Sequence, residues 1–181
     1  MKINECKLIL YCAGFVTVTS VWLLLCTEGM SVLTLFRFTL LMVFGYIAAV
    51  IDLNTKCIPN SLVYSMLSVW LLTTILQILL DTDAGIKLLT DSMLGLLAGG
   101  GLFLVVYLVS RQGLGGGDVK FMAAAGLYLG FGLTLPAILY GTVLAALTGL
   151  ILVLLKKIKR KDTMPLAPFL YIGILITVFM V

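Results

Sequence analysis

Residues 134–155 read TLPAILYGTVLAALTGLILVLL and carry no charged side chain. A helix needs roughly 20 apolar residues to cross the hydrocarbon core of a bilayer. The whole chain of 181 residues is 62% hydrophobic and only 11% charged. Soluble domains carry about a quarter charged residues, so this chain cannot build a water-facing surface. The sequence therefore predicts an integral membrane protein.

Six further apolar segments lie around this stretch, and we expect all seven to be helices, because lipid leaves an open chain few other ways to satisfy its backbone. The segment 119–131 is short for a span, and we expect it to form a tilted or partly buried helix in a hairpin with its successor. The segments run roughly over 8–26, 32–51, 58–80, 86–110, 119–131, 134–155 and 165–181.

The predicted fold is an all-α, polytopic membrane helix bundle with about six to seven transmembrane helices. The chain has no room for a second domain beside the helices, so we expect one integral-membrane domain over residues 1–181. Within it, an extra N-terminal helix (about 8–26) precedes a core (about 32–181). The first segment lacks a convincing small-residue cleavage site, so we interpret it as a retained helix rather than a secretory signal.

The basic residues are unevenly distributed between the two sides of this bundle. With a cytoplasmic N-terminus, the inner segments hold ten Lys or Arg, the outer segments hold only Lys87, and Arg37 lies within a helix. Cytoplasmic loops carry an excess of Lys and Arg, so the bias predicts a multi-pass protein of the cell membrane with the N-terminus inside. The ten are Lys2, Lys7, Lys56, Arg111, Lys120, Lys156, Lys157, Lys159, Arg160 and Lys161.

This orientation signal also explains the net charge of +4, so we expect no nucleic-acid partner. The chain contains no His, and its four cysteines show no CxxC spacing. That pattern argues against a structural zinc site and against His-based catalysis. We expect reduced thiols in or near the membrane, with no metal and no cofactor. The cysteines are Cys6, Cys12, Cys26 and Cys57.

Charged groups at membrane boundaries or within spans are costly and are functional candidates. Asp91 and Arg37 lie at similar depths in their predicted helices, counted from the outer side, and we expect them to pair or each to reach outward to solvent. Asp52 and Asp118 remain as the two acids of interest. The other five acids, which we expect to be solvated, are Glu5, Glu28, Asp81, Asp83 and Asp162.

Asp52 lies at the cytoplasmic end of segment 32–51, in the sequence IDLNTKCIPN (residues 51–60). Pro59 can begin the next helix, because the first helical position needs no N–H donor. Taken alone, Asp52 could simply cap a turn. It is the second acid at the same predicted depth that makes a functional role attractive.

Asp118 closes the glycine-rich sequence GLGGGDVK (residues 113–120) between two predicted helices. So many glycines cost conformational entropy, which indicates a sharp bend or a close approach. A phosphate-binding loop would need the pattern GxxxxGK[ST], but Lys120 is followed by Phe121. A plain N-cap role for Asp118 is compatible with the sequence but leaves the glycines unexplained.

Two carboxylates at one depth offer a coherent hydrolytic mechanism. When two acids approach within a few ångströms, like-charge repulsion leads the pair to share one proton. The ionised member can then take a proton from water as the water attacks a carbonyl, while the protonated member donates to the leaving amine. This chemistry needs neither histidine nor metal.

Together, residues 52–60 and 115–120 resemble the paired signatures of the type IV prepilin peptidases, within the broader GxGD class of membrane aspartyl proteases. The sequence MPLAPF (residues 164–169) resembles that family's closing segment, and the similarity covers about residues 45–181. The resemblance implies that Asp52 and Asp118 are catalytic and that Gly115 and Gly117 shape the loop. It also assigns supporting roles to Pro59, Asn60 and Lys120.

The resemblance further implies an aspartic endopeptidase that removes a short basic leader from prepilin-like or pseudopilin-like precursors at the cytoplasmic face, in type IV pilus assembly or protein secretion. Because the CxxC pairs of many members are missing here, we expect a short form without N-methyltransferase activity. A small cation- or proton-coupled transporter using the same aspartates is the alternative. The sequence leaves open the oligomeric state, the precursor, and whether the two carboxylates touch in the resting protein.

Two pairs of glycines four residues apart indicate close packing between helices. Gly95 with Gly99, and Gly126 with Gly130, form small-xxx-small pairs. Such spacing lets helices approach closely in lipid. It does not by itself say which helix meets which.

Overall fold

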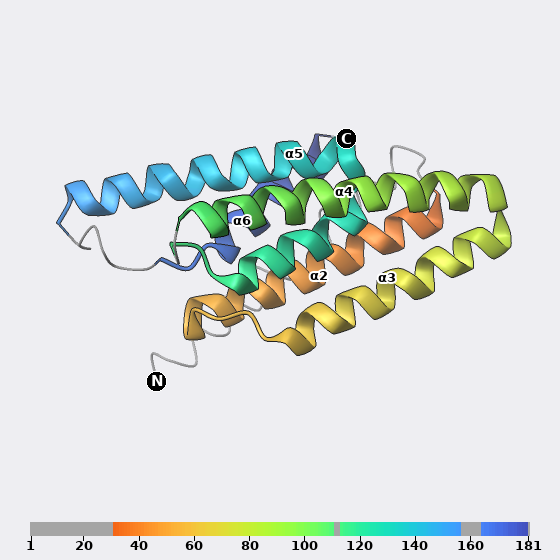
Figure 1. The fold of residues 1–181 in the computed structure, drawn as a ribbon, viewed down its shortest axis with the longest axis horizontal. Coiled ribbons are helices and arrows are strands. Elements are labelled where there is room, and N and C mark those ends of the chain that lie inside the picture. Colours follow the sequence, from red (N-terminus) through yellow and green to blue (C-terminus); the bar gives the residue numbers. More distant parts are fainter. Residues whose placement is uncertain (1–30, 111–112, 157–163, 181) are drawn as a thin grey trace.

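The structure, a computed structural model, describes residues 31–110, 113–156 and 164–180 and is helical in nearly all of them (Figure 1). Helices α2, α3, α4 and α5 are long and apolar enough to cross a membrane, whereas α6 is shorter. The all-α fold is therefore confirmed for this part of the chain. The predicted helix 8–26 and the orientation of the N-terminus lie outside it. The helices are α2 (Val32–Thr55), α3 (Asn60–Leu80), α4 (Thr82–Val109), α5 (Gly116–Leu154) and α6 (Ala167–Phe179).

The helix ends follow from local capping. The Ser31 hydroxyl accepts from the backbone N–H of Thr34 at the start of α2, and the Asp81 carboxylate does the same for Ala84 at the start of α4. At its C-terminus α2 extends to Thr55 and closes on Lys56, whose φ of 53° is left-handed. Asp52 therefore lies within the last turn of α2, three residues before its final residue, rather than at the end itself.

Pro59 differs slightly from the prediction. It is the N-cap of α3, with an extended backbone (φ −70°, ψ 141°), and Asn60 is the first helical residue. The physical reason for a proline here is unchanged, because the start of a helix has backbone N–H groups without helical partners and tolerates a residue that lacks one.

Helix α5 is two helical parts that meet at Gly130, which has non-helical dihedral angles (φ 70°, ψ 179°). Gly95 on α4 faces Gly126 and Gly130, and Gly99, one turn further on, faces Met122 and Thr134. Moving one turn along α4, from Gly95 to Gly99, therefore changes the facing residue from Gly126 back to Met122 on the first part of α5. On the second part it changes the facing residue from Gly130 forward to Thr134. The chain therefore reverses direction at Gly130, and Figure 1 shows two parts of α5 that run in opposite directions. This agrees with the predicted hairpin between residues 119–131 and 134–155.

Asp91 stabilises this reversal from α4. Its Oδ1 accepts a hydrogen bond of 3.1 Å from the backbone N–H of Phe131, the first residue after the turn.

Arg37 is buried, with 4% of its surface exposed, and donates to Ser92 and to the carbonyl of Leu127. The expectation that Arg37 and Asp91 pair directly or reach outward is therefore wrong for Arg37, because polar groups of α4 and α5 meet its guanidinium inside the bundle.

The small-residue pairs bring α4 against α5. A Cβ on Gly126 would collide with the carbonyl oxygen of Gly95, and a Cβ on Gly95 would collide with the carbonyl oxygen of Gly126. The two backbones are thus in direct contact, which explains why both positions are glycine.

We expect Gly126→Ala to destabilise the protein by about 2 kcal/mol, because the added methyl must push two backbones apart. Gly101→Ala, on the same pair of helices but with nothing within 4 Å of its Cβ, is the control and should be neutral or slightly stabilising. Thermal unfolding of both variants in detergent checks the difference. Equal melting temperatures would contradict the close contact.

Candidate active site

Asp52 and Asp118 come from different helices but lie at one end of the bundle. Asp52 is in the last turn of α2, and Asp118 is in the first turn of α5. In Figure 1 these two helix ends and the start of α6 gather at the same end of the molecule. The short connections on either side therefore converge on a single region.

The Asp52 carboxylate is held by the N-terminus of α6. Its side chain is 5% exposed, and its Oδ2 accepts a hydrogen bond of 3.0 Å from the backbone N–H of Ala167. The backbone of Leu166 also donates to it. Free N–H groups and the positive end of the dipole make a helix N-terminus a favourable place for a carboxylate, which offsets part of the cost of burying Asp52.

Asp118 is half-buried at the third position of α5. Its carboxylate accepts from the backbone N–H of Gly115, the N-cap of the helix, and interacts electrostatically with Asp52. The other oxygen, Oδ1, is buried and has no hydrogen-bond partner within the described residues. Both acids accept hydrogen bonds from backbone N–H groups rather than from each other. Their carboxylates therefore interact through their charges alone, and Oδ1 of Asp118 remains for another partner.

The glycines of the loop make room for this arrangement. A Cβ on Gly115 would lie 3.0 Å from Oδ2 of Asp118, and a Cβ on Gly117 would lie 3.1 Å from Cβ of Ile58. Gly115 therefore lets the carboxylate fold back on the loop, and Gly117 lets the loop pack on the connection between α2 and α3. Both predicted loop residues have a steric reason to be glycine.

A side-chain hydrogen bond joins the same two segments. Nζ of Lys120 donates to Oδ1 of Asn60 at 2.9 Å, across sixty residues of sequence. Pro59 lies between Asn60 and the Ile58 contact, as the N-cap of α3. The residues singled out in the two motifs thus meet in space: Asp52, Pro59 and Asn60 from one, and Gly115, Gly117, Asp118 and Lys120 from the other.

Sequence reasoning assigned no role to the contact between Asp52 and α6. Residues 164–169 resemble the family's closing segment, but Ala167 and Leu166 act through backbone N–H groups that carry no side-chain signal. The available signal was Pro168, which lies in the first turn of α6 and marks a helix start. In the part of the chain that the structure describes, no group of three His, Cys, Asp or Glu side chains comes together as a metal site.

The fold and the site define a helical protein with membrane-length helices and two interacting carboxylates at one end. The chain belongs to the type IV leader peptidase family, which it matches over residues 39–153.

Three similar proteins are each named prepilin leader peptidase/N-methyltransferase. The one from Bacillus subtilis is 28% identical over 70% of this chain and 48% of its own length. The one from Escherichia coli is 31% identical over 71% of this chain and 56% of its own, and that from Legionella pneumophila is 29% identical over 80% and 52%. The chain spans about half the length of these curated relatives. No solved structure matches it.

Proposed function

We propose that this chain is an aspartic endopeptidase of the cell membrane that removes the short basic leader from prepilin-like precursors at the cytoplasmic face. The observation that carries the proposal is the convergence of Asp52 and Asp118, which interact electrostatically from two helices. Family membership supports a leader peptidase, and the paired acids supply its chemistry. A transporter is not favoured, because both acids lie at the bundle end, whereas transport sites usually lie near the bilayer midplane.

The proposed mechanism uses the two carboxylates as a unit that shares one proton. The ionised member takes a proton from water, and the water oxygen bonds to the scissile carbonyl carbon. The protonated member gives its proton to the leaving nitrogen as the C–N bond breaks, which yields a new carboxyl group and a new amino terminus. The buried Oδ1 of Asp118, which has no partner within the described residues, is the oxygen available to the reactants.

The placement of the substrate follows from the orientation that the basic residues predict. With residues 52–60 and 113–120 on the cytoplasmic side, a precursor would present its leader to water and its apolar helix to the bilayer. Large apolar side chains exposed on α3 and α4, such as Leu72, Leu79, Leu97 and Leu108, face outward and suit lipid or an apolar helix. The scissile bond then lies at the depth of the two aspartates.

Cleavage of a purified precursor tests the proposal. We would mix the detergent-purified chain with a peptide that carries a basic leader and an apolar helix, and identify the products by mass spectrometry. One cut between leader and helix is expected, insensitive to EDTA and without transfer of a methyl group from S-adenosylmethionine to the new terminus. A folded protein that cuts no precursor of this kind, in detergent or in liposomes, would sink the proposal.

The hydrogen bond between Lys120 and Asn60 positions the two motifs. We expect Asn60→Ala and Lys120→Met each to slow cleavage by about three- to tenfold, because an exposed pair contributes roughly 1 kcal/mol. The double variant should be no slower than the worse single variant, since both remove the same contact. Single-turnover rates check this, and fully additive losses would show that the two side chains act separately.

A further inference from the structure

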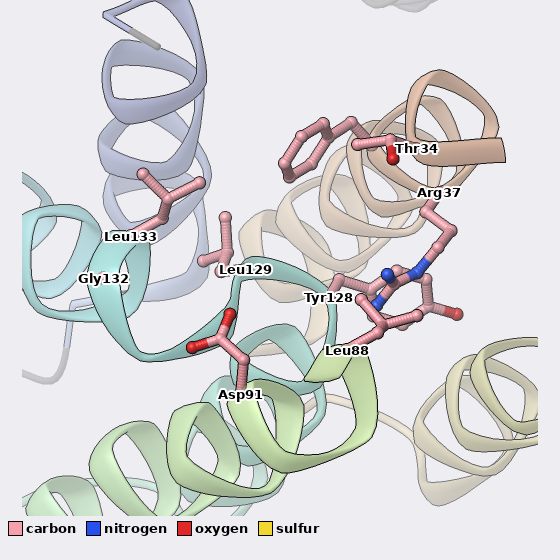
Figure 2. Close-up of a pocket in the computed structure, with 9 residues that line it drawn as sticks. Thr34, Arg37, Leu88, Asp91, Tyr128, Leu129, Gly132 and Leu133 are labelled. Atoms are coloured by element: carbon pink, nitrogen blue, oxygen red, sulfur yellow. The ribbon is translucent and has the colours of Figure 1, made fainter. Parts of the chain in front are cut away.

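A cavity lies at the end of the bundle opposite to Asp52 and Asp118. It has a volume of about 470 Å³. Arg37 and Asp52 are both on α2, fifteen residues apart, which corresponds to roughly 22 Å along a helix. The cavity is therefore separate from the candidate active site. Its walls include Arg37, Phe38, Leu88, Asp91, Leu129 and Leu133, most of which Figure 2 labels.

Arg37 brings a buried cation to this cavity with one donor unused. The side chain is 4% exposed, and Nη2 donates weakly to Ser92 at 3.4 Å and to the carbonyl of Leu127 at 3.3 Å. Its Nε is buried and has no partner among the residues that the structure describes. A buried charged donor that is left unsatisfied is costly, so an acceptor at this position would be strongly favoured.

Asp91 brings the opposite charge to the same cavity. It lies well inside α4, yet its side chain is exposed, and one backbone N–H, that of Phe131, donates to its Oδ1. An ionised carboxylate at membrane depth needs a cationic partner. Arg37 interacts with it only at longer range, and Lys87, one turn earlier, lines a neighbouring hollow that Asp91 also borders.

The remaining walls are mostly apolar, and the two polar ones, Thr34 and Tyr128, hydrogen-bond with Ser31 and with the carbonyl of Met66. Phe38, Leu88, Leu129 and Leu133 surround the two charged groups. The cavity therefore combines an unused N–H donor, an exposed carboxylate and an apolar lining. A ligand that satisfies all three must carry an anion, a hydrogen-bonding cation and a hydrocarbon chain.

We propose that this cavity binds a zwitterionic phospholipid with a primary ammonium in its headgroup. The phosphate meets Nε of Arg37, the ammonium donates to the Asp91 carboxylate, and the acyl chains lie along the apolar walls. Charge-assisted hydrogen bonds of this kind are about twice as strong as neutral ones. A phosphatidylglycerol headgroup has no cation for Asp91, and a phosphatidylcholine headgroup has a quaternary cation that cannot donate a hydrogen bond.

Lipid retention tests the proposal without using cleavage as a readout. We would reconstitute the full chain in nanodiscs with equal amounts of phosphatidylethanolamine, phosphatidylcholine and phosphatidylglycerol of matched acyl chains. After extraction into mild detergent, native mass spectrometry counts the retained lipids. Phosphatidylethanolamine should exceed each of the other two by about fivefold or more. An even distribution would overturn the proposal.

Three variants assign the contacts. Asp91→Asn keeps an oxygen for the Phe131 N–H, so it should fold normally, retain lipid and lose the preference over phosphatidylglycerol. Arg37→Gln removes the contact with the phosphate that all three lipids share, so it should retain less of each lipid, whereas the neighbouring Lys87→Gln should match wild type. Unchanged selectivity for phosphatidylethanolamine in folded Asp91→Asn, or loss of that selectivity in Lys87→Gln alone, would overturn the assignment.

Soluble glycerophosphoethanolamine at millimolar concentration should not displace the lipid, and displacement would show that the ligand is the free headgroup instead.

Discussion

Asp52→Asn and Asp118→Asn should each reduce precursor cleavage by about a thousandfold or more, because a carboxylate that relays a proton in the transition state contributes factors of this size. Asparagine has nearly the same shape and keeps an oxygen that can accept the Ala167 N–H at position 52 and the Gly115 N–H at position 118. The amide can neither take a proton from water nor deliver one to the leaving nitrogen. The fold is expected to survive while the chemistry stops.

Single-turnover kinetics with a labelled precursor measure this loss directly. Asp83→Asn is the matched control, since it makes the same change in the first turn of α4, on a helix whose start is far from the site. It should cleave at the wild-type rate. Unfolding curves in detergent must show that all three variants are folded. Near-normal cleavage by either Asp52→Asn or Asp118→Asn would mean that the pair is not the catalytic unit.

Gly130→Ala should lower the free energy of unfolding by about 3 kcal/mol or more, because two independent costs add. The backbone of Gly130, at φ 70° and ψ 179°, lies in a region that is accessible almost exclusively to glycine. A Cβ there would also collide with Oδ2 of Asp91, the acid that accepts from Phe131. The methyl group would thus strain the turn and displace the side chain that stabilises it.

Gly132→Ala is the matched control, because it lies two residues away in a helical position with nothing within 4 Å of its Cβ. Alanine is favoured over glycine in a helix by about 1 kcal/mol, so this variant should be as stable as wild type or more so. Unfolding in mixed micelles with increasing SDS measures both. If Gly130→Ala unfolds at the same SDS fraction as wild type, the reversal does not depend on this backbone conformation.

Much of the helical architecture was predictable from local sequence. The uncharged run 134–155 and its neighbours identify membrane-length helices, because burial in lipid demands long apolar segments. The interruption near residues 131–134 was visible as well, and the structure places the reversal at Gly130. Helix ends shifted by a few residues, as at Asp52 and Pro59, since capping contacts decide the last turn and leave little trace in hydropathy.

The candidate acids were also visible in the sequence. A chain with only eight Asp and Glu residues and a glycine run before one of them draws attention to residues 52 and 118, because charges near a membrane need a reason. The catalytic role of these two acids stays a prediction until the variants are measured.

Contacts between helices depended on the tertiary structure. Which face of a helix meets which neighbour depends on its rotation about its own axis, and a change of one residue turns that face by about 100°. The Ala167 N–H that holds Asp52 comes from 115 positions away, and Asn60 meets Lys120 across another long interval. Arg37 and Asp91 line one cavity instead of forming the expected pair, because Ser92, Leu127 and Phe131 lie closer to their charged ends. Composition determines that such charges need partners, but only the packed helices determine what those partners are.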